Sequence, residues 1–208
     1  MITQGVWKKD DQLKQIPWFT DEIIKKARDR GVQSPFDILE LEDDIRGEIL
    51  DKYGDDSKEM SEIAAFCNSF PTVEVGFEIV DEDDITAGDP FRVSVRLARE
   101  VDEDEDEDED EIGKVVSKTF PKDKVESWWL VLGDPVNNRL YTVKRTTLAE
   151  TASLNLDSYA PEDPGEYGLK LYLMSDSYLG VDQEFDVKIS VAVGEDGSDD
   201  DDDEMDEN

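Results

Sequence analysis

Apolar residues recur at helical spacing in the first third of the chain. Thr20 has the position of a helix cap, and the apolar stripe behind it consists of Ile23, Ile24 and Ala27. A later helix is expected over about Asp56–Asn68, because Asp56 and Glu59 have the spacing of a capping box. The pattern therefore predicts a helical subdomain over residues 1–70.

After Pro71 the hydrophobic period changes to two. Apolar positions recur at every second residue over 73–79, 91–97, 152–157, 167–173 and 185–193, and the segments 127–133 and 139–145 between them bring the number of expected strands to at least seven. Alternation gives each strand one buried and one wet face, as in antiparallel sheets around a shared core. The sequence thus predicts an α+β chain in which a small, helix-hairpin-helix-like subdomain precedes an immunoglobulin- or fibronectin-like antiparallel β-sandwich over 71–193.

Two acidic runs change this picture. Of 56 Asp and Glu residues against 22 Lys and Arg, residues 100–111 hold 11 acids and residues 194–208 hold 10, without a base in either. Such segments cannot bury enough apolar surface to order, so we expect a disordered acidic loop over 100–113 and a disordered acidic tail over 194–208. Their carboxylates lack the spacing of a calcium loop. A net charge of −34 disfavours a nucleic-acid duplex or an anionic membrane as a direct partner.

Candidate catalytic chemistry is sparse. The chain has no histidine, one cysteine (Cys67) and no GxxxxGK[ST] phosphate loop, so we expect no catalytic residue, no cofactor and no metal site. The stretch FEIVDEDDI (77–85) resembles the strand and acids that hold magnesium in helicases. However, Glu74, Gly76 and Glu78 interrupt its apolar positions, which favours a half-exposed strand followed by a polar turn.

The candidate protein-contact residues lie in the sandwich. Trp128 and Trp129 are adjacent, so on a strand they point to opposite faces, and one of them should be core while the other is exposed. The full set comprises Trp128, Trp129, Met174, Tyr178, Arg139, Lys144 and Arg145. The exposed tryptophan could instead be covered by the acidic loop or the helical part, which is the favoured interpretation. The three bases are expected to form one modest cluster that could receive an acidic partner, but pairing with surface acids across strands is favoured.

A cationic helix end is the one candidate for RNA contact. The segment IPWFTDEIIKKARDRGV (16–32) looks like a helix-hairpin-helix, but its hairpin lacks the glycines that let a phosphate approach. Its bases are Lys25, Lys26, Arg28 and Arg30. Cations at a helix C-terminus suit the helix dipole, which favours a solvated helix end over an RNA-binding surface.

The segments SWWLVLGDPVNNRLYTVKRTTL (127–148) and LKLYLMSDSYLGVDQEFDVKISV (169–191) contain the most specific motifs, WWLVLGD (128–134) and YLMSDSYLGVDQEFD (172–186). Together with residues 15–50 and 64–90 they resemble, in order, the C-terminal end of Brr-two-like spliceosomal RNA helicases, the U-five snRNP 200-kilodalton helicase family. Each helicase cassette of that family ends in a Sec-sixty-three-type module with a helical part and an immunoglobulin-like sandwich. The run at 100–111 departs from the family in its length and acidity.

The resemblance implies a non-catalytic C-terminal interaction module of a nuclear, ATP-dependent pre-mRNA-splicing helicase that unwinds the U-four/U-six duplex. Its expected partners are the helicase domains of its own parent chain and spliceosomal proteins, with no direct RNA contact and no membrane. Two other interpretations remain open. One is a stand-alone acidic chaperone or nucleic-acid mimic, and the other is the same module in a sister helicase of ribosome quality control or alkylation repair.

Overall fold

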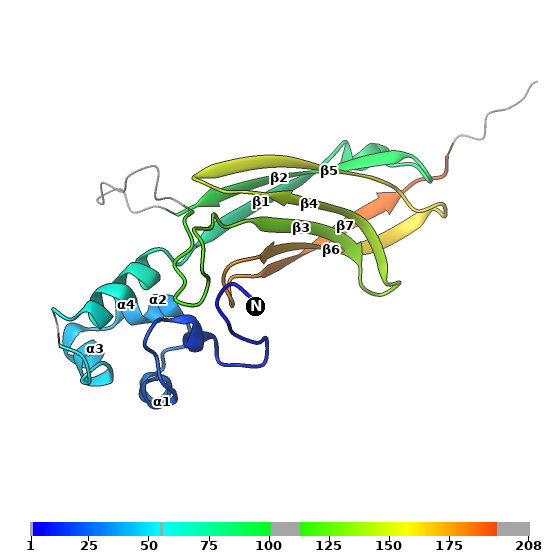
Figure 1. Cartoon of the computed structure of the whole chain (residues 1–208). Helices are drawn as coiled ribbons and strands as arrows, with labels where there is room; N and C mark the ends of the chain where they lie inside the picture. Colours follow the sequence, from blue (N-terminus) through cyan, green and yellow to red (C-terminus); the bar gives the residue numbers. More distant parts are fainter. Residues whose placement is uncertain (1, 55, 101–112, 195–208) are drawn as a thin grey trace, which may run out of the picture.

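The computed structural model describes residues 2–54, 56–100 and 113–194, in which helices come first and strands follow (Figure 1). The helices are η1 (Gln12–Gln15), α1 (Asp21–Asp29), α2 (Pro35–Glu40), α3 (Asp43–Ile49), α4 (Lys58–Asn68) and the short turn η2 (Glu82–Asp84). The strands are β1 (Val73–Val80), β2 (Pro90–Arg99), β3 (Trp128–Asp134), β4 (Arg139–Thr146), β5 (Thr151–Tyr159), β6 (Gly165–Ser175) and β7 (Gln183–Val191). This order confirms the α+β expectation.

Local side chains start the helices. The Thr20 hydroxyl accepts a hydrogen bond from the Ile23 N–H and caps α1, as expected. The cap of α4 is Ser57, whose hydroxyl accepts from the Met60 N–H at 3.2 Å, so the expectation of Asp56 as the cap is wrong by one residue. Both residue types are good caps, and the sequence pattern does not separate two that are adjacent.

Two antiparallel sheets, ordered β1-β2-β5 and β4-β3-β6-β7, form the sandwich, and the helices gather beyond one end of it (Figure 1). Strand β1 pairs only with β2, and the acids that follow it lie in the exposed turn η2. A magnesium-binding acid of a nucleotide motor would instead follow a central parallel strand. The interpretation of residues 77–85 as a strand and a polar turn is therefore confirmed.

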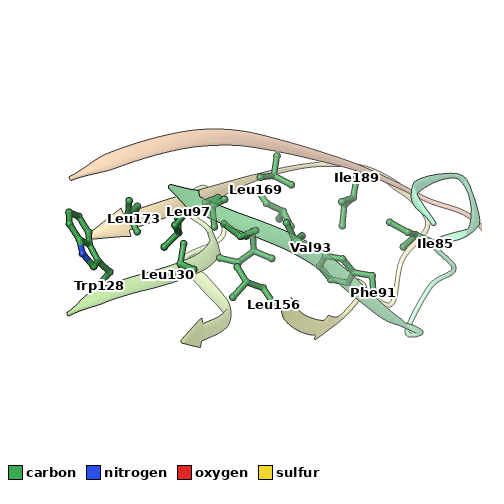
Figure 2. Close-up of a cluster of buried hydrophobic side chains, with 14 of the residues drawn as sticks. Ile85, Phe91, Val93, Leu97, Trp128, Leu130, Leu156, Leu169, Leu173 and Ile189 are labelled. Atoms are coloured by element: carbon green, nitrogen blue, oxygen red, sulfur yellow. The ribbon is translucent and has the colours of Figure 1, made fainter. Parts of the chain in front are cut away.

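The main hydrophobic core lies between the sheets. Alternate residues of β2 (Val93, Leu97) and β3 (Trp128, Leu130) are fully buried in it. Trp128 lies at one end of this core and Ile85 at the other (Figure 2). Burial of so many apolar side chains is the main favourable contribution to the stability of the sandwich.

A second core lies among the helices, and one sandwich residue belongs to it. The ring of Tyr178, from the segment between β6 and β7, makes edge-to-face contacts with Phe66 and Phe70 at centroid distances of 5.9 and 5.4 Å. Its hydroxyl accepts a hydrogen bond from the Val116 N–H at 3.2 Å. Gln15 adds a second link, because its side chain donates to the Leu179 carbonyl and accepts from the Leu179 N–H.

The expected acidic loop and acidic tail lie outside the described residues, apart from Glu100, Gly113 and Gly194 at their edges. Glu100 donates its backbone N–H to the Thr72 carbonyl, and Gly113 accepts from the Glu126 N–H at 2.9 Å. Within the described part of the chain, none of the helices is both long and apolar enough to cross a membrane.

Candidate protein-interaction site

The outer faces of the two sheets differ along β4, β3 and β6, whereas β7 carries polar outward residues such as Glu184, Asp186 and Lys188. On β1-β2-β5 most outward positions are polar, including Glu74, Glu78, Arg92, Ser94, Arg96, Ser153, Asn155 and Asp157, and the apolar ones are Val80, Pro90, Ala98 and Tyr159. This is the face that an antiparallel sheet normally turns to water. It gives no indication of a protein contact.

On β4, β3 and β6 two rows of outward positions are apolar except for Arg145. Trp129 of β3 is flanked in register by Arg145 of β4 and Met174 of β6. The next row is formed in the same way by Val143, Val131 and Tyr172. We call these six residues the outer apolar face. Trp129, Met174 and Val143 are 39%, 42% and 46% exposed, so large apolar side chains remain in contact with water here.

Arg145 is held at one end of the outer apolar face. Its guanidinium carbon lies 5.4 Å from the centroid of the Trp129 ring, within cation–π distance. Its Nη2 donates to the Asp176 carboxylate at 2.8 Å, and the Lys124 ammonium donates to the same carboxylate at 2.6 Å. Asp176 is thus shared by two cations, and the group of three carries a net charge of +1.

The Asp176 carboxylate stays ionised in this network. Burial alone would raise its pKa, but hydrogen bonds from Lys124, Ser177, the Ser127 N–H and Arg145 outweigh burial and hold the pKa below its ordinary value. The Ser127 N–H donates at 2.9 Å and the Ser177 hydroxyl at 2.7 Å. A charged Asp176 therefore fixes Arg145 against Trp129 at neutral pH.

The two adjacent tryptophans point to opposite faces, as expected. Trp128 is fully buried, and its Nε1 donates to the buried Glu126 carboxylate at 3.0 Å. Glu126 also forms an ion pair with Arg99. Trp129 is the exposed member of the pair, so Trp128 is a core residue and is not available to a partner.

The prediction that Tyr178 contacts a partner is also wrong. It is fully buried between the helices and the sandwich, so its contacts are internal and it cannot meet a partner at the surface. The segment between β6 and β7 folds back against helix α4, a contact between residues far apart in sequence. Local spacing in the sequence carries no signal for such a contact.

The three bases do not form the expected cluster. Lys144 and Arg145 are neighbours on β4 and point to opposite sides, because side chains alternate along a strand. The Lys144 ammonium donates to the Asn155 carbonyl and lies 3.4 Å from the Asp157 carboxylate, which links β4 to β5. Arg139 lies at the other end of β4, over the Tyr141 ring at 4.8 Å. Only Arg145 joins the outer apolar face.

Three members of the outer apolar face are not among the contact residues predicted from the sequence: Val131, Val143 and Tyr172. A signal existed for the first, because Trp128–Leu132 is an uninterrupted apolar run. Such runs are typical of strands whose two faces are both covered. In this fold only one face of β3 is covered by the sandwich core, so the run marks a second face that lacks a cover within the described residues.

The cations of α1 are engaged with carboxylates. Lys26 pairs with Asp51 at 2.8 Å and Arg28 with Asp11 at 2.7 Å, while Arg30 pairs with Glu48. Three of the four bases are thus neutralised by neighbours, which agrees with a solvated helix end.

The described residues offer no evident reactive centre. Burial raises the pKa of the Cys67 thiol to about 12, so the thiolate needed for nucleophilic chemistry does not form near neutral pH. Among the described residues, no group of three or more acidic or cysteine side chains is placed to hold a metal ion.

Comparison with known proteins gives a consistent result. The family model of the Sec63 Brl domain matches residues 1–188. The human U5 small nuclear ribonucleoprotein 200 kDa helicase is 41% identical over 201 residues, which is 97% of this chain and 9% of that protein. Its Drosophila melanogaster counterpart is 43% identical over 94% of the chain and 8% of that protein. Pre-mRNA-splicing factor brr2 of Schizosaccharomyces pombe is 36% identical over 92% and 8%. The chain thus spans less than a tenth of each relative.

Proposed function

Because the chain belongs to the Sec63 Brl domain family, we propose that it is a non-catalytic protein-interaction module of a pre-mRNA-splicing RNA helicase. In this proposal the parent protein unwinds the U4/U6 RNA duplex with ATP in the nucleus. The module itself docks on the helicase domains of its parent and recruits spliceosomal proteins. The splicing context is supported by the names of the relatives, which are a U5 small nuclear ribonucleoprotein helicase and a splicing factor.

The outer apolar face is the observation that carries the interaction role. Contiguous exposed apolar surface on a soluble domain is typical of a site that another molecule covers. Tryptophan, methionine and arginine are the residue types enriched at protein interfaces, and Trp129, Met174 and Arg145 lie side by side here. The face of β1-β2-β5 supports this assignment. Its outward residues are mostly polar, as expected of a face that contacts only water, whereas those of the outer apolar face are mostly apolar.

Charge supports a protein partner over RNA. A net charge of −34 repels a phosphate backbone, and three cations of α1 are already paired with carboxylates. The outer apolar face presents one charged side chain, Arg145, among five uncharged ones. Its composition is that of a surface covered by apolar protein groups.

An affinity tag on the native protein tests the proposed function. After purification from nuclear extract, we expect U5 small nuclear RNA to be enriched well above an untagged control, because the parent would be part of that particle. The tagged polypeptide should also be far longer than this chain. A short tagged polypeptide without U5 RNA would contradict the proposal and favour a stand-alone acidic chaperone.

A further inference from the structure

We propose that the outer apolar face receives one amphipathic helix of a second protein, oriented so that an acidic side chain of the helix meets Arg145. This inference rests on the proposed function and deepens it by naming the kind of partner. It is carried by the backbone pairing of the three strands, the width of the face and its charge.

Backbone pairing excludes an added strand as the occupant. Strands β3 and β6 are paired on both sides, so they have no free edge. The outer edge of β4 is approached by β5, where the Ser158 hydroxyl donates to the Tyr141 carbonyl at 3.2 Å and Lys144 donates to the Asn155 carbonyl. The occupant must therefore satisfy its own backbone groups while it covers apolar side chains. A helix does this, whereas an extended peptide would bury unpaired N–H and C=O groups.

The width of the face matches one helix. Neighbouring strands lie about 4.8 Å apart, so β4, β3 and β6 span roughly 10 Å from axis to axis. A helix with its side chains is about 10–12 Å across. The two rows, together with Leu140 at 61% exposure and Lys170 in the row beyond them, extend along the strands for about two and a half helical turns.

The positive charge of Arg145 favours a partner helix that carries an acidic residue at this end. Arg145 is the one charged member of the outer apolar face, and its side chain is 52% exposed. Lys170, in the row that contains Leu140, already pairs with Glu184 and Asp186, each at 2.8 Å. Asp176 is shared between Arg145 and Lys124, so the carboxylate does not cancel both cations. An acidic residue on the partner helix would gain a charge-assisted hydrogen bond at this end.

The other occupants that the chain could supply fit poorly. A second copy would bring another net charge of −34 against this one. Residues 100–111 contain a single apolar residue, Val101, and residues 195–208 likewise contain only Met205. Neither acidic segment has the apolar residues needed to cover Trp129, Val143 and Met174.

Synthetic helices test the inference on the 208-residue chain. The probe is a stapled helix of about fifteen residues with leucines at i, i+3, i+4 and i+7 spacing and glutamates at both ends of that stripe. A matched probe carries lysines in place of the glutamates, and a third has the same composition in scrambled order. Binding is followed in ¹H–¹⁵N spectra, in which the indole signals of Trp7, Trp18, Trp128 and Trp129 report from four separate places.

With the glutamate helix we expect saturable shifts of the Trp129 indole and of the Val131 and Val143 amides, with the Trp18 indole unmoved. Arg145→Glu should weaken the glutamate helix about tenfold or more and strengthen the lysine helix, and Trp129→Asp should abolish both. The inference is overturned if neither helix binds, if the scrambled probe binds equally, or if Arg145→Glu leaves the preference unchanged. Recovery of U5 RNA with the tagged native protein would still support the proposed function in those cases.

Discussion

Trp128→Ala is expected to lower the free energy of unfolding by about 3–5 kcal/mol, the range for removal of a large buried aromatic side chain. Trp128 is fully buried at one end of the sandwich core (Figure 2). The substitution also removes the indole N–H that donates to Glu126 at 3.0 Å, so a buried carboxylate loses a hydrogen-bond donor. Urea denaturation followed by circular dichroism measures the change without relying on tryptophan fluorescence.

The adjacent tryptophan is the matched control. Trp129 is 39% exposed on the opposite face of the same strand, and we expect Trp129→Ala to lower the free energy of unfolding by less than about 1 kcal/mol. Equal losses at the two positions would mean that the alternation of β3 is not as described. The assignment of Trp129 to a surface available to partners would then fail as well.

Tyr178→Ala is expected to lower the free energy of unfolding by about 3–5 kcal/mol and to loosen the helices from the sandwich. Its ring packs against Phe66 and Phe70, and its hydroxyl accepts a hydrogen bond from the Val116 N–H. Relative to the unsubstituted protein, amide hydrogen exchange in the variant should accelerate more in α4 than in the central strands β2 and β3. The reason is that Tyr178 belongs to the helical core.

Tyr178→Phe separates the ring from the hydroxyl. It keeps the aromatic contacts and removes one hydrogen bond, so a loss of about 1 kcal/mol is expected. If Tyr178→Ala left α4 protected while the strands exchanged faster, Tyr178 would not be the contact that joins the two cores.

Most strands could be predicted from the sequence, because their inward residues are apolar and the residues between them are polar. In β2, for example, the inward residues are Phe91, Val93 and Val95. Helix α1 could be predicted because Thr20 and the stripe behind it are local signals. Strand β3 breaks the alternation, and that local conflict marks the site: Trp129 and Val131 are apolar at outward positions. Such conflicts between local pattern and fold are expected where a surface has a function.

The rest depended on contacts between distant residues. Alternation requires that one of Trp128 and Trp129 is buried, but it does not say which, because that is decided by the pairing of β3 with β4 and β6. Tyr178 lies between serine, aspartate and glycine residues in the sequence, and only its contact with Phe66 of α4 shows that it belongs to a core. Lys144 and Arg145 point to opposite sides of β4 for the same reason that the two tryptophans do on β3, so strand geometry separates these two bases.

Photo-crosslinking from position 129 tests the central claim, that the outer apolar face contacts protein, most directly. A benzophenone amino acid replaces Trp129 in the native protein, and Ser153, on the polar face of the other sheet, receives the same group as a control. After irradiation in nuclear extract, we expect position 129 to crosslink efficiently to a spliceosomal protein or to the helicase domains of the parent, and position 153 to give only background. Equal yields at the two positions would contradict the account.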